Sequence, residues 1–109
     1  VESFSEDTER LGLRLISSSI CRSLCKGKLS DCTEKQKDYK QADFEPLIDK
    51  QKNMGGPASS IDKFLVKSFQ VQANTCKLEV ELATINDKQG TYLVEYNLFS
   101  ESYNAQPRG

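Results

Sequence analysis

Histidine and tryptophan are both absent from this sequence. Histidine is the usual general base near neutral pH, so its absence excludes Ser-His and Cys-His nucleophile pairs and removes the commonest zinc ligand. No glycine-rich phosphate-binding loop follows a strand-like segment, and no pair of carboxylates is marked out by its spacing. We therefore expect a protein that is not an enzyme and that needs neither a cofactor nor a metal.

An excess of one charge and a long apolar run are missing as well. The 15 Lys and Arg residues balance 16 Asp and Glu residues, for a net charge of -1. Such a chain has no general field that draws it to nucleic acid, and no apolar run approaches the roughly 18 residues needed to cross a bilayer. We expect a protein partner, no nucleic acid and no membrane span, while the oligomeric state stays open.

Cysteine is the residue type that the sequence does supply, at Cys21, Cys25, Cys32 and Cys76. In a small chain, four cysteines fit two disulfides formed in an oxidising compartment, with three possible connectivities. Cys21 and Cys25 lie one helical turn apart, which suits two separate partners better than a mutual bond. We predict that Cys76 is tied to one of the other three. A four-cysteine zinc site and four reduced, buried thiols are the alternatives.

The amino terminus adds to the case for secretion. Residues 1–4 include no initiator methionine and no signal-like apolar stretch, which is typical of a processed end or of the boundary of an excised segment. Together with the cysteines, this favours a secreted or extracytoplasmic protein.

An amphipathic pattern dominates the amino-terminal part of the chain. Apolar residues recur at spacings of three and four within residues 5–26, which predicts a helix, and Ser5 followed by acidic residues supplies an amino-terminal cap. Residues 11–15 also alternate, so a short strand is the competing interpretation. The polar segment 26–39 predicts a solvated loop or a short exposed helix.

The second half of the chain has the period-two alternation of β-strands. The β-like region begins at residue 61, residues 64–71 form one candidate strand, and apolar and polar residues alternate in residues 76–82 and again in residues 92–98. The short link between the last two segments requires an antiparallel hairpin, because a parallel crossover is much longer. One face of this hairpin carries most of the large side chains and must be covered by other parts of the chain.

Breaks in the pattern mark the remaining segments. Pro46 interrupts the apolar residues 42–48, which predicts an edge strand or an entry turn, and residues 53–60 predict a loop. Residues 101–109 are polar and predict a frayed tail.

These segments predict a single α+β or β-rich domain over residues 1–109. A helical, cysteine-bearing segment covers residues 1–40, and an antiparallel β segment covers residues 41–100. We expect the amino-terminal helix to pack on a three- to five-stranded antiparallel sheet. An incomplete immunoglobulin- or filamin-like sandwich is the alternative architecture.

Residues 87–96, Asp-Lys-Gln-Gly-Thr-Tyr-Leu-Val-Glu-Tyr, resemble a signature of the filamin-type repeat, in which an aspartate and a turn precede Gly-Thr-Tyr and an alternating strand. Residues 49–56, followed by residues 64–66, resemble the turn before the third strand of that family. The order and approximate spacing agree over residues 42–99. The resemblance implies an immunoglobulin-like fold with a scaffolding or adhesion role.

The filamin resemblance further implies that a partner segment is captured by strand addition beside residues 63–71 and 76–83. The leading functional prediction is thus a non-enzymatic extracellular module that binds a protein through an exposed sheet edge. The partner-binding residues implied are Phe64, Val66, Phe69 and Val71.

A second stretch resembles the Gln-Val-Val-Ala-Gly hairpin loop of cystatins, inhibitors of papain-like proteases in which a sheet wraps around one helix. The inhibitory loop implied is formed by Gln70, Val71, Gln72, Ala73 and Asn74. Asn74 stands where the family has glycine, the segment between helix and sheet is longer, and the Pro-Trp pair of the family's second loop is missing. A secreted effector, toxin or ligand is the third functional class.

Overall fold

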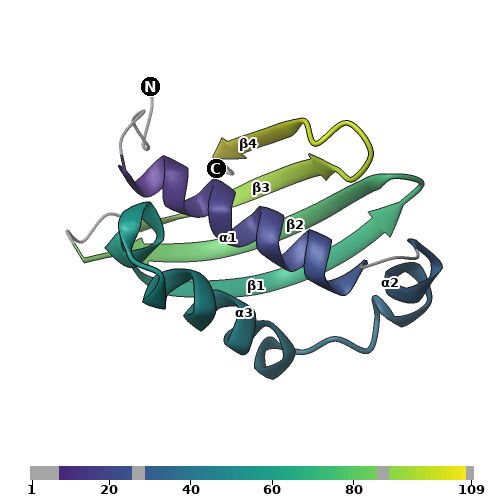
Figure 1. The fold of residues 1–109 in the computed structure, drawn as a ribbon, viewed down its shortest axis with the longest axis horizontal. Helices are drawn as coiled ribbons and strands as arrows, with labels where there is room; N and C mark the ends of the chain where they lie inside the picture. The colour runs from purple at the N-terminus through teal and green to yellow at the C-terminus, as the bar shows by residue number, and fades with distance from the viewer. Residues whose placement is uncertain (1–7, 26–28, 86–88, 108–109) are drawn as a thin grey trace.

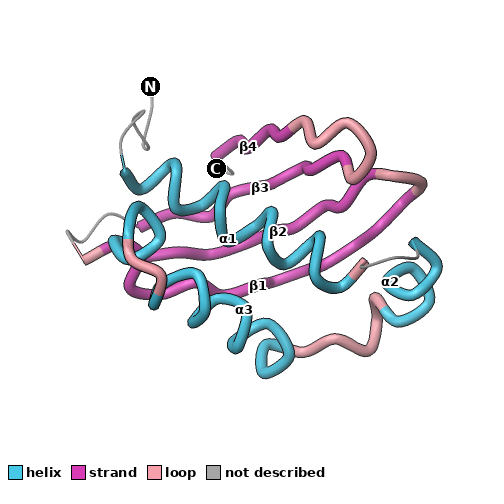
Figure 2. Tube along the Cα trace, viewed as in Figure 1, coloured by secondary structure: helices cyan, strands magenta, loops and turns pink. Residues whose placement is uncertain are grey.

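The computed structural model describes residues 8–25, 29–85 and 89–107, in which helices pack on one side of an antiparallel sheet (Figure 1). The helices are α1 (Thr8–Leu24), α2 (Leu29–Lys35), α3 (Gln41–Asn53) and the 3-10 helix η1 (Gly56–Ser60). The strands are β1 (Ile61–Gln72), β2 (Thr75–Thr84), β3 (Gln89–Asn97) and β4 (Tyr103–Pro107). They lie side by side in the order β1-β2-β3-β4 (Figure 2). The expected α+β architecture is confirmed, with one four-stranded sheet in the described ranges.

The predicted amino-terminal helix is α1, and the strand interpretation of residues 11–15 is wrong. Its buried stripe has helical spacing and contains Leu13, Ile16, Ile20 and Cys21. Gly12 permits a close approach of η1, because a Cβ atom at this position would lie 2.6 Å from the carbonyl oxygen of Pro57. The cap predicted at Ser5 lies outside the described residues.

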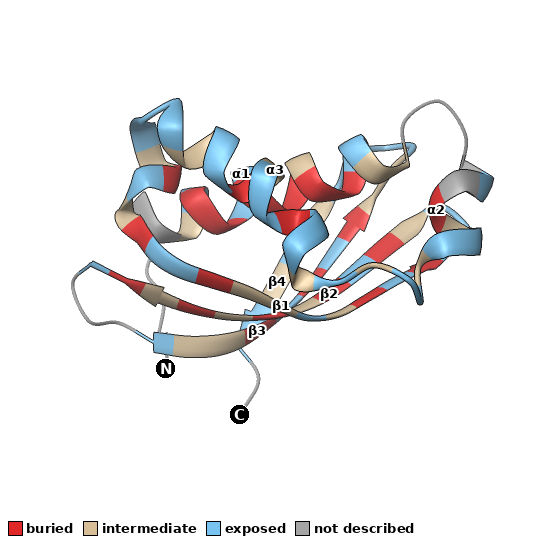
Figure 3. Ribbon diagram, turned by 90° about the horizontal axis from the view of Figure 1, so that it is seen from below, coloured by how far each residue is buried: buried red, intermediate tan, exposed pale blue. Residues whose placement is uncertain are grey.

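The face of the sheet turned toward the helices forms the core, as Figure 3 shows by its buried residues. β2 and β3 present their alternating apolar side chains to this face, as predicted. The buried residues of these two strands are Cys76, Leu78, Val80, Leu82, Thr84, Tyr92, Val94 and Tyr96. The opposite face carries exposed polar residues such as Lys77 and Glu95. This difference is typical of an antiparallel sheet with one face covered by helices and the other in contact with solvent.

The edge strand or turn predicted for residues 42–48 is wrong, because these residues belong to α3. Pro46 lies inside the helix, where it cannot donate the usual backbone hydrogen bond. The helix begins with a favourable contact, since the Asp43 carboxylate accepts a hydrogen bond from the backbone N–H of Lys40 at 2.8 Å. Phe44 and Ile48 are buried, and this tertiary burial outweighs the local effect of the proline. The short exposed helix expected within residues 26–39 is α2.

The frayed tail predicted for residues 101–109 is also wrong over β4. This strand pairs with β3, with Tyr103 opposite Tyr96 and Ala105 opposite Val94. The connecting turn is held by the Asn97 side chain, whose Oδ1 accepts hydrogen bonds from the backbone N–H groups of Phe99 and Ser100. Tyr103 and Ala105 are both partly buried against the core, which explains why a polar segment is ordered here.

Two disulfides connect these layers, and all four cysteines take part. Cys21 of α1 is bonded to Cys76 of β2 with a Cα–Cα distance of 6.1 Å, which confirms the predicted tether. Cys25 is bonded to Cys32 of α2 with a Cα–Cα distance of 5.0 Å. The alternatives of a zinc site and of reduced thiols are therefore wrong.

We predict that the two disulfides contribute unequally to stability. The Cys21–Cys76 bond closes a separation of 55 residues and the Cys25–Cys32 bond one of 7 residues. Loop-closure entropy then gives about 4 kcal/mol for the first and about 2 kcal/mol for the second. Denaturant unfolding of the double variants C21A/C76A and C25A/C32A measures both. If C25A/C32A lost as much unfolding free energy as C21A/C76A, or more, the tethering role of Cys21–Cys76 would be contradicted.

Candidate functional site

The side chains that the filamin resemblance assigned to partner binding lie mostly in the core. Phe64, Phe69 and Val71 are buried, and Val66 packs partly buried against them. The ring of Phe69 makes an edge contact with Tyr39, with centroids 5.5 Å apart, and a tilted contact at 5.7 Å with Phe44 of α3. These β1 side chains therefore hold α3 and the segment before it against the sheet.

The outer edge of β1 is occupied by side chains from the helical segment. The Gln41 amide nitrogen donates to the carbonyl oxygen of Phe64 at 3.0 Å, and its oxygen accepts from the Val66 N–H at 2.9 Å. One amide group thus makes the two hydrogen bonds that a residue of a neighbouring parallel strand would make. Gln36 accepts from the Val71 N–H at 2.9 Å in the same way. Partner binding along β1 stays a prediction, and it would require the release of these glutamines.

The other edge of the sheet is β4, which within residues 8–25, 29–85 and 89–107 pairs with β3 alone. Next to this strand, the Asn97 N–H donates to the carbonyl oxygen of Ser102 at 2.9 Å, which fixes the alternation of the ladder. By this alternation, the backbone groups of Asn104 and Gln106 point toward β3, while those of Tyr103 and Ala105 point away from it. The signal for this edge in the sequence was the weak alternation of residues 103–107, and the sequence analysis missed it.

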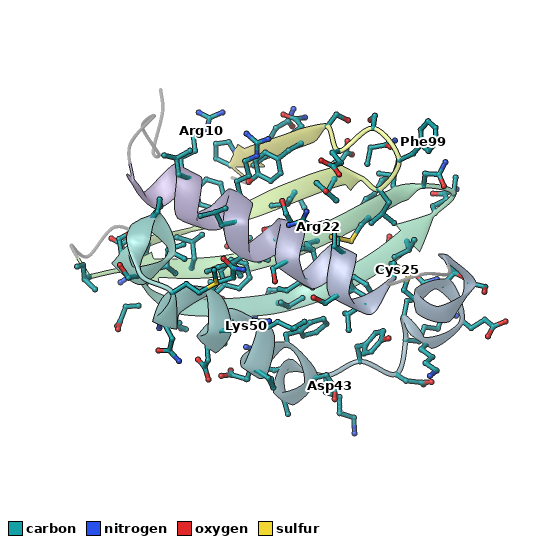
Figure 4. The ribbon with its side chains drawn as sticks, in the orientation of Figure 1. Arg10, Arg22, Cys25, Asp43, Lys50 and Phe99 are labelled. Atoms are coloured by element: carbon teal, nitrogen blue, oxygen red, sulfur yellow. A yellow bond between two sulfur atoms is a disulfide. The ribbon has the colours of Figure 1, made fainter. Side chains whose placement is uncertain are left out.

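A cleft of about 250 Å³ lies between α1 and β4, lined by Arg10, Leu11, Arg14, Tyr103, Asn104 and Ala105. The Arg14 guanidinium carbon lies 5.6 Å from the centre of the Tyr103 ring, a cation–π contact that joins the two walls. Arg10 lies near the amino-terminal end of α1 (Figure 4). Burial raises the pKa of the Tyr103 phenol well above its usual value, and the positive charges of Arg10 and Arg14 oppose this rise.

Two turns meet at one end of the sheet. The Leu98 N–H donates to the carbonyl oxygen of Asn74 at 2.7 Å, so the β1–β2 turn and the β3–β4 loop lie side by side. Phe99, in the second loop, is 86% exposed, and Figure 4 shows its ring pointing away from the sheet. Of the residues assigned to the inhibitory loop, Val71 is buried, and the other four are exposed at this end: Gln70, Gln72, Ala73 and Asn74.

Comparison of the chain with protein-family models, with curated proteins and with solved structures gives no match. The filamin and cystatin resemblances therefore stay predictions. None of the described helices is long and apolar enough to cross a membrane. The described residues also contain no group of three or more Cys, Asp or Glu side chains placed to hold a metal ion.

We predict that Gln41→Ala opens the outer edge of β1. The change removes both hydrogen bonds to β1, together with an exposed one to the Glu45 carboxylate, which costs about 1–3 kcal/mol of unfolding free energy and speeds amide hydrogen exchange at Val66. Gln51→Ala, the same change on the same helix, is the control. Unchanged exchange at Val66 in the Gln41 variant would show that this amide does not protect the edge.

Proposed function

We propose that the protein is a non-enzymatic extracellular module that binds a protein partner by adding a strand to β4. Strand addition obtains its affinity from main-chain hydrogen bonds and its specificity from the alternate side chains beside them. β4 suits this mode because it is the sheet edge that the helical segment with Gln36 and Gln41 does not cover. The outer side of β4, with which no further strand of the described chain pairs, is the observation that carries the proposal.

The two disulfides support the extracellular part of the proposal. Disulfides form and persist in oxidising environments, and small domains in these environments use them to supplement a limited core. The Cys21–Cys76 bond also ties the sheet to α1, and a sheet that is held in its binding conformation loses little conformational freedom when a strand is added.

Ala105→Pro tests strand addition directly. The outward N–H of Ala105 is removed, while the ladder bonds to β3 come from Asn104 and Gln106 and are retained. We expect peptides selected by phage display against the wild-type protein to lose binding by about tenfold or more, since a hydrogen bond and the steric fit of the edge are both lost. Affinity is measured by isothermal titration calorimetry.

Ala105→Ser, which keeps the N–H at the same position, is the matched control and should bind the selected peptides as the wild type does. Circular dichroism of both variants checks that the sheet is intact. Equal binding by the proline and serine variants, or a selection that yields no specific peptide, would contradict strand addition at β4.

A cystatin-like inhibitor of papain-like proteases is the second candidate. One observation favours it: two turns lie side by side at one end of the sheet, joined by the hydrogen bond from Leu98 to Asn74, with the exposed Phe99 at their tip. Such a pair of loops has the shape of a wedge that could enter a protease cleft. The apolar Phe99 would supply the contact that the missing Pro-Trp pair makes in the family.

A papain inhibition assay tests the cystatin-like function. If the wedge is functional, micromolar protein lowers papain activity, and Phe99→Ala weakens inhibition by tenfold or more because a buried aromatic anchor is lost. Leu93→Ala, which removes another exposed apolar side chain away from these loops, is the control. Full papain activity in the presence of the wild-type protein would exclude the inhibitor function.

A further inference from the structure

The cleft between α1 and β4 combines features that the strand-addition proposal does not use. Two guanidinium groups, from Arg10 and Arg14, lie one helical turn apart on the α1 wall. The part of its lining that the structure describes contains no Asp or Glu. The described lining therefore carries positively charged side chains and no negatively charged one, in a chain whose net charge is -1.

The Tyr103 wall of the cleft contains a polar group whose bonding is incomplete. The hydroxyl of Tyr103 is buried, and it has no hydrogen-bond partner among the described residues. Buried hydroxyls are nearly always hydrogen-bonded in folded proteins, so an unpaired one needs an explanation such as a ligand or an ordered water molecule. The ring of the same tyrosine lies under the Arg14 guanidinium group, so Tyr103 and Arg14 connect the two walls of the cleft.

The remaining lining limits the size and character of a ligand. Leu11, which is half exposed, and Ala105 add apolar surface beside the charged groups. At about 250 Å³, the cleft is smaller than the 300–1,000 Å³ typical of pockets for drug-sized molecules. The space suits a compact molecule with one charged head and a small apolar body.

We propose that this cleft binds a small organic anion, with its carboxylate or phosphate head on the Arg14 guanidinium and its apolar body against Leu11 and the Tyr103 ring. Guanidinium groups present a planar fork of donors that matches carboxylate and phosphate oxygens. The cation–π contact keeps the Arg14 head in place, so little side-chain freedom is lost on binding. This proposal does not depend on strand addition, although both involve residues of β4.

The test uses the disulfide-bonded protein and three probes of similar shape. Benzoate and phenyl phosphate carry the two possible heads, and benzamide is the neutral control. In an NMR titration at constant ionic strength, we expect saturable shifts of the backbone amides of residues 10–14 and 103–105 with at least one anion and none with benzamide. The anion that binds more tightly identifies the head group.

Two variants locate the site. Arg14→Gln should weaken the anion by about tenfold, the effect of losing a hydrogen bond to a charged group. Arg22→Gln, eight residues and about 12 Å further along α1, is the charge-matched control and should leave the affinity unchanged. Ala105→Glu leaves both arginines in place and should abolish binding, because its carboxylate competes from the opposite wall.

Three outcomes would overturn the proposal. The first is the absence of a saturable shift with either anion, and the second is equal binding of benzamide. The third is an equal loss in the Arg14→Gln and Arg22→Gln variants, which would indicate general charge attraction. Thermal melting curves show whether each variant is folded. If the Arg14→Gln variant is not folded, the Ala105→Glu variant decides the test.

Discussion

The covalent bond between Cys21 and Cys76 determines how the rest of the molecule is arranged. It joins the buried stripe of α1, near the carboxyl-terminal end of the helix, to the buried face of β2 at the start of that strand. The second bond, from Cys25 to Cys32, fixes α2 at the end of α1, and Gln36, just after α2, binds the β1 edge at Val71. The two bonds together help a modest core to maintain three kinds of contact. These are the contacts of helix with sheet, of helix with helix, and of the helical segment with the sheet edge.

This arrangement makes the two edges of the sheet different. Gln36 and Gln41 occupy the β1 edge with amide groups that take the place of a neighbouring strand, which protects it from unwanted pairing. β4 has no such cover from this segment, and its start lies beside the cleft of Arg14 and Tyr103. The surfaces with binding potential therefore gather around β4 and the loop that leads into it, away from α3.

The sequence predicted the features that depend on local periodicity. Helical spacing revealed α1, alternation revealed the β2–β3 hairpin, and the four cysteines indicated a tether through Cys76. It failed where distant contacts decide the structure. The helix around Pro46 forms because Phe44 and Ile48 are buried in tertiary contacts, such as that of Phe44 with Phe69 of β1, which no local pattern reports. The candidate site was missed for the same reason, since Arg14 and Tyr103 are 89 positions apart in the sequence (103 − 14) and meet only through the fold.

Disulfide mapping on the non-reduced protein tests the central claim most directly. Trypsin separates all four cysteines, because Lys and Arg residues lie between them. The structure predicts that the peptide of residues 15–22 is linked to that of residues 68–77, and that residues 23–26 are linked to residues 29–35. Any other linkage, or a free thiol at Cys76, would contradict the tether between α1 and β2.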